Sequence, residues 1–426
     1  MTSFLVSLTL LLGVSGSGAP ATCHARNEME VLRADWVNPP HVFVVLLARN
    51  KEASLPYFLT YFERLKYPKA SMTLYLRADH SEDKTIAILG EWLELNNRFY
   101  RAVDAKLEKH PRCFDKENQP HYITDEMIEH VIKLKTQAFK AAQDASADYV
   151  MFLDVDVYLT NKDTLSSLIA QNYTIVSPML ESLHSYANFW GAFSEDFWYE
   201  RSDDYEDIQK RKVNGCFQVP VVHSCVLINL NCNENIRKIT FNSDELNDPA
   251  VPYDDIVSFG VSVQRAGLTN HVCNVVRYGY VDYPIQAGDP LSTAFLHLRD
   301  LKLKIVRHQP QLIVSPRLAH LLPRPSVDTA GLSKIFYMNL ARRPDRRARM
   351  EYVLKNAGLR ATRVEAVDGR TLNSSYLEGR GVRVMTGYYD PNKQRQGMTK
   401  GEIGCFLTHY DIWKEVVDKQ HQRVST

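Results

Sequence analysis

The sequence predicts an α/β protein built around a parallel sheet. Short apolar runs rich in β-branched residues alternate with amphipathic stretches of helical period, which is the pattern of successive strand–helix–strand units. Several of these runs end in polar residues, as expected where strands deliver side chains to one edge of a sheet. At 426 residues the chain is too long for one typical core, so we expect two domains.

The first domain is expected over residues 38–305. It should open with a strand, a helix, a second strand and a long helix, at residues 41–48, 55–65, 72–76 and 125–145. The long helix is the clearest, because acids fill its first turn and its apolar residues recur on one face. Arg49 follows the first strand, Asp79 lies in the polar loop after the second, and Lys133 lies on the long helix. That loop suits a nucleotide at the sheet edge.

An apolar run at residues 149–153 ends in two acids, Asp154 and Asp156. The pattern indicates a buried strand that carries both acids to its carboxyl end. Residues i and i+2 of a strand point to the same side, so the two carboxylates could converge on one hard cation. Two carboxylates and the phosphates of a nucleotide are common ligands of Mg²⁺ or Mn²⁺. The alternative is a strand followed by an Asx turn with no ligand.

Four further positions each have a structural and a functional interpretation. Asp254 and Asp255 precede an apolar helix, where acids act as caps worth typically ~1 kcal/mol, but one of them could be a general base for an acceptor hydroxyl. His223 interrupts a strand predicted at residues 221–229, and a single His in such a run is more often a core residue than a ligand. His297 also has apolar neighbours, yet a neutral imidazole there could complete a metal site.

Composition and the N-terminus indicate the compartment. Hydrophobic residues at 45% and charged residues at 24% are ordinary for a globular protein, and a net charge of +1 gives no reason to expect nucleic acid or an anionic membrane as a partner. Residues 1–21 combine an uncharged apolar run with small residues, which predicts a secretory signal peptide; a buried strand is the alternative. No later stretch resembles a membrane span. We therefore expect a soluble protein that is lumenal or secreted.

Sequons and cysteines agree with that compartment. Asn172 and Asn373 each begin an Asn-x-Ser/Thr triplet and are candidate glycosylation sites. None of the seven cysteines belongs to a CxxC pair, so neither a zinc site nor a thioredoxin-like motif is supported. The odd total leaves at least one cysteine without an intramolecular partner. In an oxidising lumen, disulfides could form among Cys216, Cys225, Cys232 and Cys273.

A second α/β domain is expected over residues 332–426. Residues 306–331 are punctuated by prolines and predict a linker between the domains. The second domain then opens with a strand, a helix and another strand, at residues 334–340, 343–357 and 363–367.

Taken in chain order, the polar positions resemble a known layout. Their order is similar to that in metal-dependent nucleotide-sugar transferases of the GT-A type. It consists of a nucleotide-edge loop, a helix with Lys133, an Asp-x-Asp after a strand, a second acid pair and a late His. Two motifs of the second domain resemble glycosyltransferase family 25 more specifically, namely IFYMNLARRPDRR at 335–347 with EAVDG at 365–369, and TKGEIGCFLTH at 399–409. The first domain resembles that of the procollagen galactosyltransferases of this family at residues 48–50, 130–134, 154–156 and 253–255.

The resemblance implies a reaction. Galactose would pass from UDP-galactose to hydroxylysine in collagen or procollagen chains, β-linked and with inversion, in the endoplasmic reticulum lumen. Mn²⁺ would be the metal cofactor. The first domain would have a GT-A-like fold.

The resemblance also assigns roles to residues already singled out. Asp154 and Asp156 would hold the metal and the diphosphate, with His297 as a further metal ligand. The catalytic base would be Asp255 or its neighbour Asp254. The residues near the nucleotide would be Arg49, Asp79 and Lys133.

The family pattern extends past the part of the second domain that this sequence contains. We therefore expect residues 332–426 to be the N-terminal part of a truncated domain that lacks its own acidic site and exposes apolar surface. If that domain carries essential chemistry, the chain is inactive. Two alternatives stay open: a non-catalytic, adhesion-like relative, and a transferase of different sugar specificity. A homo-oligomer is a further hypothesis.

Overall fold

The computed structural model describes residues 38–109, 123–306, 311–323, 327–390 and 394–426. The chain divides into two compact units. The first comprises the described residues up to Phe295 together with Ile313–Ala319, and the second comprises those of Leu296–Leu312 and His320–Thr426. The predicted signal peptide at residues 1–21 lies outside the described residues.

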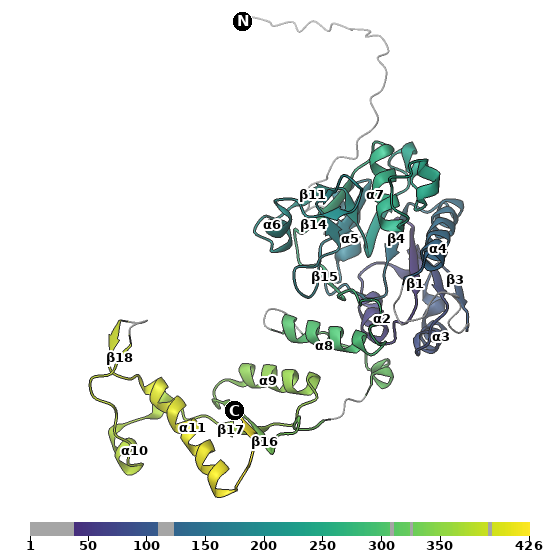
Figure 1. Cartoon of the computed structure of the whole chain (residues 1–426). Coiled ribbons are helices and arrows are strands. Elements are labelled where there is room, and N and C mark those ends of the chain that lie inside the picture. The colour runs from purple at the N-terminus through teal and green to yellow at the C-terminus, as the bar shows by residue number, and fades with distance from the viewer. Residues whose placement is uncertain (1–37, 110–122, 307–310, 324–326, 391–393) are drawn as a thin grey trace, which may run out of the picture. The chain divides into compact units, whose positions relative to one another are not determined.

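The first unit is built on an eight-stranded mixed sheet (Figure 1), so the predicted α/β class is confirmed. Four neighbouring strands, β3-β2-β1-β4, run parallel to one another. Strand β13 then runs antiparallel between β4 and β6. In spatial order the strands are β11 (Cys216–Val219), β14 (Asn270–Cys273), β6 (Ile175–Pro178), β13 (Cys225–Asn229), β4 (Tyr149–Leu153), β1 (Val42–Ala48), β2 (Met72–Ala78) and β3 (Ala102–Leu107).

The chain reverses its direction of travel across the sheet between β1 and β4. From β1 it proceeds outward to β2 and β3, and then it returns to β4 on the other side of β1. Register places Val45 opposite Phe152, so the carboxyl ends of β1 and β4 lie side by side. In open α/β sheets a crevice forms outside such a reversal, and this is where ligands bind.

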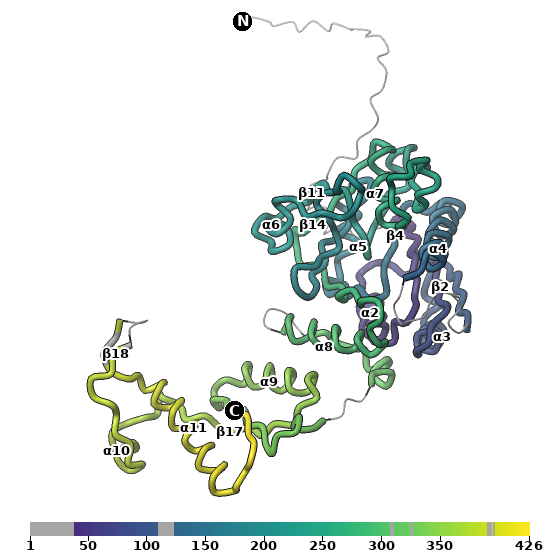
Figure 2. The backbone as a smooth tube through the Cα atoms, in the orientation of Figure 1, coloured from purple at the N-terminus to yellow at the C-terminus, as the bar shows by residue number. Residues whose placement is uncertain are grey.

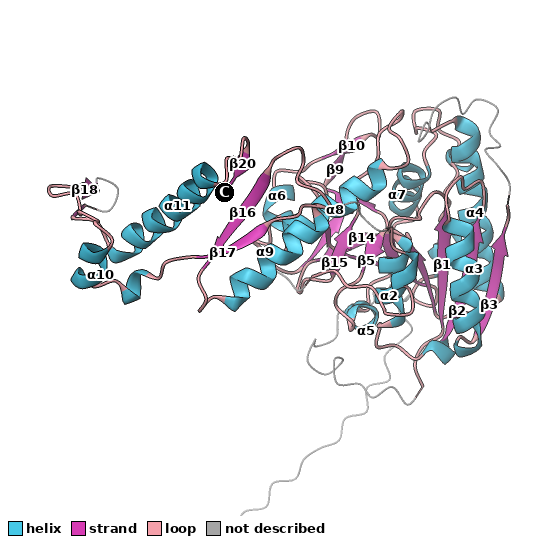
Figure 3. Cartoon of the chain, turned by 90° about the horizontal axis from the view of Figure 1, so that it is seen from below, coloured by secondary structure: helices cyan, strands magenta, loops and turns pink. Residues whose placement is uncertain are grey.

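Helices cover the sheet, with α3 and α4 alongside β1 to β3 (Figure 3). The predicted apolar face of α4 is confirmed, since Ala138, Phe139 and Ala142 are buried in one cluster with Phe259 of α7 and side chains of the sheet. Helices α2 and α3 contact each other through Phe62 and Trp92. The helices of this part are α2 (Leu55–Glu63), α3 (Thr85–Asn96), α4 (Asp125–Asp144), α5 (Thr164–Gln171), α6 (Tyr205–Gln209) and α7 (Asp255–Arg265).

The strand predicted over residues 221–229 is wrong as a single strand. It is two strands, β12 (Val221–Val222) and β13, because Ser224 adopts a left-handed conformation with φ 62°. Strand β12 pairs with β8 (Phe189–Trp190) instead of joining the main sheet. The interruption by His223 and Ser224 is therefore a corner of the chain. Nearby, β9 (Ala192–Phe193) and β10 (Tyr199–Glu200) form a further hairpin.

A separate three-stranded sheet begins just after β4 in the chain. It consists of β5 (Val157–Tyr158), β15 (Gly279–Val281) and β7 (Leu180–Glu181). A Cβ at Gly279 would lie 2.1 Å from the carbonyl oxygen of Tyr158, so only glycine permits this approach. The backbone N–H of Asp282 donates to the carbonyl of Asp156 at 3.1 Å.

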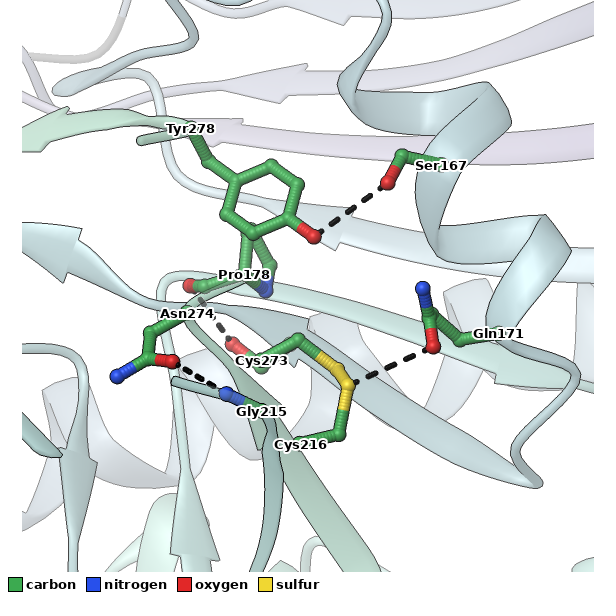
Figure 4. Close-up of a disulfide and its surroundings, with 9 residues drawn as sticks. Ser167, Gln171, Pro178, Gly215, Cys216, Cys273, Asn274 and Tyr278 are labelled. Atoms are coloured by element: carbon green, nitrogen blue, oxygen red, sulfur yellow. Dashed lines mark hydrogen bonds between the residues drawn. A yellow bond between two sulfur atoms is a disulfide. The ribbon is translucent and has the colours of Figure 1, made fainter. Parts of the chain in front are cut away.

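A disulfide between Cys216 and Cys273 joins facing residues of β11 and β14 (Figure 4). Beside it, the Oδ1 atom of Asn274 accepts a hydrogen bond from the backbone N–H of Gly215 at 2.8 Å. Cys232 is disulfide-bonded as well. Cys225 is a buried free thiol. Of the four central cysteines, Cys225 is therefore the one that takes no part in a disulfide.

The second unit contains the predicted strand–helix–strand opening. Strand β16 pairs in parallel with β17 on one side and with β20 on the other. Figure 2 follows its backbone through α9 and α11 to the C-terminus. Its elements are α8 (Thr293–Ile305), β16 (Lys334–Asn339), α9 (Pro344–Asn356), β17 (Thr362–Glu365), α10 (Ser374–Gly379), β18 (Tyr389–Asp390), β19 (Arg395–Gln396), α11 (Lys400–Asp418) and β20 (Val424–Ser425).

The family-like motifs of the second unit hold α11 against the end of β17. A Cβ at Gly404 would lie 2.6 Å from the Val367 carbonyl, and one at Gly369 would lie 2.4 Å from the Lys400 carbonyl. The buried hydroxyl of Thr408 accepts from the Val367 N–H at 2.9 Å. Along α11, apolar side chains are exposed at Phe406, Tyr410, Trp413 and Val417.

We expect Gly279→Ala to destabilise the first unit by about 2–3 kcal/mol, because the added methyl group would collide with the backbone of β5. Gly90→Ala is the matched control. Its Cβ would meet the Leu107 side chain at an ordinary 3.8 Å, and alanine in a helix such as α3 stabilises by up to about 1 kcal/mol. Urea unfolding of both variants measures the difference. Equal stabilities would contradict the proposed close approach of β5 and β15.

Candidate functional site

Two acids lie at the carboxyl end of β4. Asp154 follows the last residue of the strand, and its backbone N–H donates to the Ser224 carbonyl at 2.8 Å. Asp156 directly precedes β5. Burial and the charge of Asp156 raise the pKa of Asp154, whereas the ammonium groups of Lys135 and Lys51 act in the opposite direction. The two ammonium groups therefore favour the ionised form of Asp154 against its burial.

Lys51, in the loop between β1 and α2, supplies part of that charge. Its ammonium group forms an ion pair with Oδ2 of Asp156. The other carboxylate oxygen, Oδ1, is buried and has no hydrogen-bond partner among the described residues. Burial alone would lower the pKa of Lys51, but the charges of Asp156, Asp154 and Asp282 raise it above its ordinary value.

Lys135 supplies positive charge from the opposite side of the site. It projects from α4 and pairs with Asp255, the first residue of α7. Burial would lower the pKa of Lys135, but the charges of Asp255 and Asp154 raise it. Lys133, predicted to lie near the nucleotide, is exposed on the same helix. Helical period could have identified Lys135, because it lies on the face that buries Ile132 and Phe139.

Asp254 is the N-cap of α7. Its Oδ1 atom accepts hydrogen bonds from the N–H groups of Ile256 and Val257, at 2.9 and 2.8 Å, and from the Tyr199 hydroxyl at 2.8 Å. Burial and the charge of Asp255 raise the pKa of Asp254. The structural interpretation therefore applies to Asp254, which caps the helix. Asp255 is the acid that pairs with Lys135, and the functional interpretation applies to it.

His223 lies at the corner between β12 and β13 and is 8% exposed. Its Nδ1 atom shares a hydrogen bond of 2.9 Å with the Ser224 hydroxyl. Burial, followed by the charge of Lys135, lowers the pKa of His223 to about 4, so the ring is neutral at pH 7. Asn188, fully buried, donates to the His223 carbonyl at 3.1 Å and fixes the corner.

The predicted nucleotide loops meet at the ends of β1 and β2. Arg49 donates through Nε to the His80 carbonyl at 3.2 Å and through Nη1 to the Met127 sulfur at 3.3 Å. Asp79 shares a hydrogen bond of 2.8 Å with Nε2 of His130, whose ring stacks on that of His80. Burial would raise the pKa of Asp79, but His130 and the other positive groups lower it. Arg49 and Asp79 thus lie together in one cluster of hydrogen bonds.

Three other predicted residues lie elsewhere. His297 is half-buried on α8, in the second unit, so its role as a metal ligand stays a prediction. Asn172 is half-buried at the end of α5, in a left-handed conformation. Asn373 is exposed and caps α10 by accepting from the Tyr376 N–H at 2.8 Å. Glycosylation of Asn172 and Asn373 likewise stays a prediction.

The side chains at the end of β4 fit a hard divalent cation. Asp154 and Asp156 offer carboxylate oxygens, and the buried Oδ1 of Asp156 lacks any other partner among the described residues. No group of three or more His, Cys, Asp or Glu side chains is arranged around a metal position in the part of the chain that the structure describes. A divalent cation here would therefore need ligands from elsewhere, and the phosphates of a nucleotide are the usual source.

Sequence reasoning missed three contributors to the site: Lys51, Lys135 and Asp282. Lys51 comes two residues after Arg49, at the carboxyl end of a strand, and this position was the available signal. Asp282 follows a three-residue strand whose pairing with β5 is not visible in the sequence. Its Oδ2 atom accepts from the Tyr158 hydroxyl at 2.8 Å.

None of the helices in the described segments is long and apolar enough to cross a membrane.

Comparison with known proteins identifies two domain families in the chain. The family model "Glycosyltransferase family 25, N-terminal domain" matches residues 39–302. The model "Glycosyltransferase family 25 (LPS biosynthesis protein)" matches residues 332–425. The two matches leave residues 303–331 between them.

Some of the similar proteins are named as galactosyltransferases and others as inactive family members. A glycosyltransferase 25 family member of Drosophila melanogaster is 39% identical over 92% of this chain and 65% of its own length. Procollagen galactosyltransferase 2 of Mus musculus is 39% identical over 90% of this chain and 61% of its own length. Inactive glycosyltransferase 25 family member 3 of Mus musculus is 40% identical over 90% and 64%. The chain therefore spans less than two thirds of these relatives.

Among solved structures, the likeness is weaker. The mannosyltransferase PcManGT of Pyrobaculum calidifontis, in complex with GDP-Man and Mn²⁺, has a TM-score of 0.34 and 13% identity, over 69% of this chain and 74% of that one. Residues 1–349 of S. aureus TarS, in complex with UDP-GlcNAc, have a TM-score of 0.33 and 15% identity, over 66% and 69%.

The depressed pKa of His223 predicts a specific dependence of stability on pH. In the unfolded chain the imidazole takes a proton below pH 6.5, whereas in the folded protein it resists protonation until pH about 4. As the pH falls between these values, the unfolded state is favoured by up to about 3 kcal/mol. We expect His223→Gln to lose less stability than the wild type between pH of about 7 and about 4.5, as measured by urea unfolding. Parallel pH profiles of the two proteins would contradict the neutral buried ring.

Proposed function

The chain belongs to glycosyltransferase family 25, and from this premise we propose that its first unit transfers galactose from UDP-galactose to hydroxylysine side chains of collagen. The similarity to a procollagen galactosyltransferase supports this choice of sugar and acceptor. The single observation that carries the proposal is the pair Asp154–Asp156 at the reversal of strand order, with one buried carboxylate oxygen of Asp156 still without a partner among the described residues.

The donor would lie across the carboxyl ends of β1, β2 and β4. Asp154 and Asp156 would hold Mn²⁺ together with the diphosphate, and Arg49 and Asp79 would lie beside the nucleoside. A bound Mn²⁺ supplies Lewis-acid stabilisation of the charge that develops on the leaving diphosphate. The exposed Lys133 would contact only the outer part of the donor.

The acceptor hydroxyl would approach near the start of α7. Asp255 would take its proton, while Lys135 holds that carboxylate in position through their ion pair. Attack from the face opposite the diphosphate gives inversion and a β-linked galactose. Lys51 and Lys135 each interact with three carboxylates, and this acidic surrounding suits an acceptor such as hydroxylysine that carries its own amine.

The compartment and the partners are proposed from the same resemblance to procollagen galactosyltransferases. We place the protein in the endoplasmic reticulum lumen, with residues 1–21 as its signal peptide and Asn172 and Asn373 as glycosylation sites. The disulfide between Cys216 and Cys273 supports an oxidising compartment. UDP-galactose and collagen or procollagen chains are its proposed partners, and self-association into a homo-oligomer stays a hypothesis.

A non-catalytic role is the second candidate. It is favoured by the inactive family member 3 proteins, which are as similar to this chain as the galactosyltransferase is. Retention of Asp154, Asp156 and Asp255 favours the enzyme. A transferase of different sugar specificity is a third reading, to be tested with other donors.

We expect Asp156→Asn to abolish Mn²⁺-dependent turnover of UDP-galactose with a hydroxylysine-containing collagen peptide, because the amide loses the charge that a cation needs. Residues 22–426 and a full-length homologue would be assayed in parallel. Asp163→Asn, at an exposed carboxylate before α5, is the control and should keep wild-type turnover. UDP-glucose as the donor tests the alternative sugar.

The outcomes separate the candidate functions. Turnover by the short chain that vanishes in Asp156→Asn would place catalysis in the first unit. Unchanged turnover in that variant would refute the role of Asp156. If neither protein binds UDP and Mn²⁺, the non-catalytic reading is favoured.

We expect the two acids at the start of α7 to respond differently to substitution. Asp255→Asn should lower turnover about 100-fold or more while UDP binding is retained, because a general base is removed. Asp254→Asn should retain most turnover and stability, because its amide oxygen can still accept the three hydrogen bonds of the cap. Steady-state kinetics and thermal melting measure both. A larger loss of turnover in Asp254→Asn would reverse the assignment.

A further inference from the structure

Lys51 is held in a position that a divalent cation would take over. Its ammonium group lies on Oδ2 of Asp156, one of the two carboxylates that would bind the cation. A cation at Asp154 and Asp156 would place a double positive charge next to this ammonium group, and the two would repel each other strongly. The metal and Lys51 cannot both keep their full attraction to Asp156.

The backbone of Lys51 is fixed independently of its side chain. The Lys51 N–H donates to the Thr85 hydroxyl at 2.6 Å, and its carbonyl accepts from the Leu55 N–H at 3.0 Å. These bonds tie the residue both to the start of α3 and to the start of α2. The Lys51 side chain is 35% exposed and has four rotatable bonds, so it can turn toward solvent without any change in the loop.

The carboxyl ends of β1 and β4 lie side by side next to the Lys51 loop, and open α/β sheets bind ligands outside such a reversal of strand order. An anion bound there would come within reach of the Lys51 ammonium group, because Lys51 follows the carboxyl end of β1. A lysine ammonium is a compact charge that suits a phosphate oxygen. A lysine side chain carries its charge at neutral pH.

We propose that Lys51 is a donor-binding residue that neutralises Asp156 in the free protein and transfers to the diphosphate of the nucleotide sugar when a divalent cation binds. This inference rests on the proposed function, because it takes the donor to be a nucleoside diphosphate sugar. It goes further by assigning one side chain two successive partners. Metal and lysine compete for Asp156 in the free protein and cooperate once the diphosphate is present.

The test uses binding, not turnover. In Lys51→Met, Mn²⁺ no longer competes with an ammonium group, so its dissociation constant without nucleotide should fall about tenfold. The dissociation constant of UDP at saturating Mn²⁺ should rise about tenfold, because a charged phosphate contact is lost. Calorimetric titration measures both. Mn²⁺ should also raise the melting temperature of Lys51→Met more than that of the wild type.

Lys84→Met is the matched control. Lys84 lies in the neighbouring loop, is 72% exposed and pairs with Glu52 at 3.0 Å, so its loss changes the net charge equally. It should change neither affinity. If Lys51→Met weakens both Mn²⁺ and UDP, or changes neither, while the wild type binds both, the inference is wrong and the proposed function survives. If the wild type binds neither ligand, both fail together.

Discussion

Asp154 and Asp156 lie close together just after a buried strand. The repulsion between their carboxylates is the constraint that the surrounding positive groups offset. Burial already disfavours the charge on Asp154, and the charge on Asp156 disfavours it further. Positive groups must therefore reach this point from elsewhere in the fold. Lys51 arrives from the loop after β1, and Lys135 from α4. Each of them is paired with a carboxylate and influenced by Asp154.

The backbone around the acids is organised to keep them in place. The left-handed turn at Ser224 ends β12 and brings the Ser224 carbonyl to the N–H of Asp154. On the other side, β15 can pair with β5 only because Gly279 has no side chain. The Asp282 N–H then binds the carbonyl of Asp156. The side chains can consequently serve a ligand, because the backbone of this turn has its own partners.

The sequence pattern predicted those features that depend on residues close together in the chain. The strand that ends just before Asp154, the apolar face of α4 and the cap at Asp254 follow from periodicity and capping, and the structure has all three, although Asp156 lies in a turn and not on the strand. What the pattern could not show is which distant charges meet. The ion pair of Lys135 with Asp255 joins two helices through residues that are 120 positions apart in the chain, and the sequence around either residue does not predict this pairing. The break at His223 was misread because an isolated polar pair in an apolar run gives no sign of a left-handed residue.

The arrangement of charges also bears on how activity divides within the family. Relatives named as galactosyltransferases and as inactive proteins are equally similar to this chain, so overall identity does not separate them. A metal-dependent transferase needs its acids and also the groups that keep those acids ionised and then meet the donor. In this chain both lysines are present, and they pair with Asp156 and Asp255. A relative that kept Asp154 and Asp156 but lost the lysines would still have the Asp-x-Asp pattern, yet nothing would offset the burial that disfavours the charge on Asp154. The lysines are thus as much a part of the site as the acids.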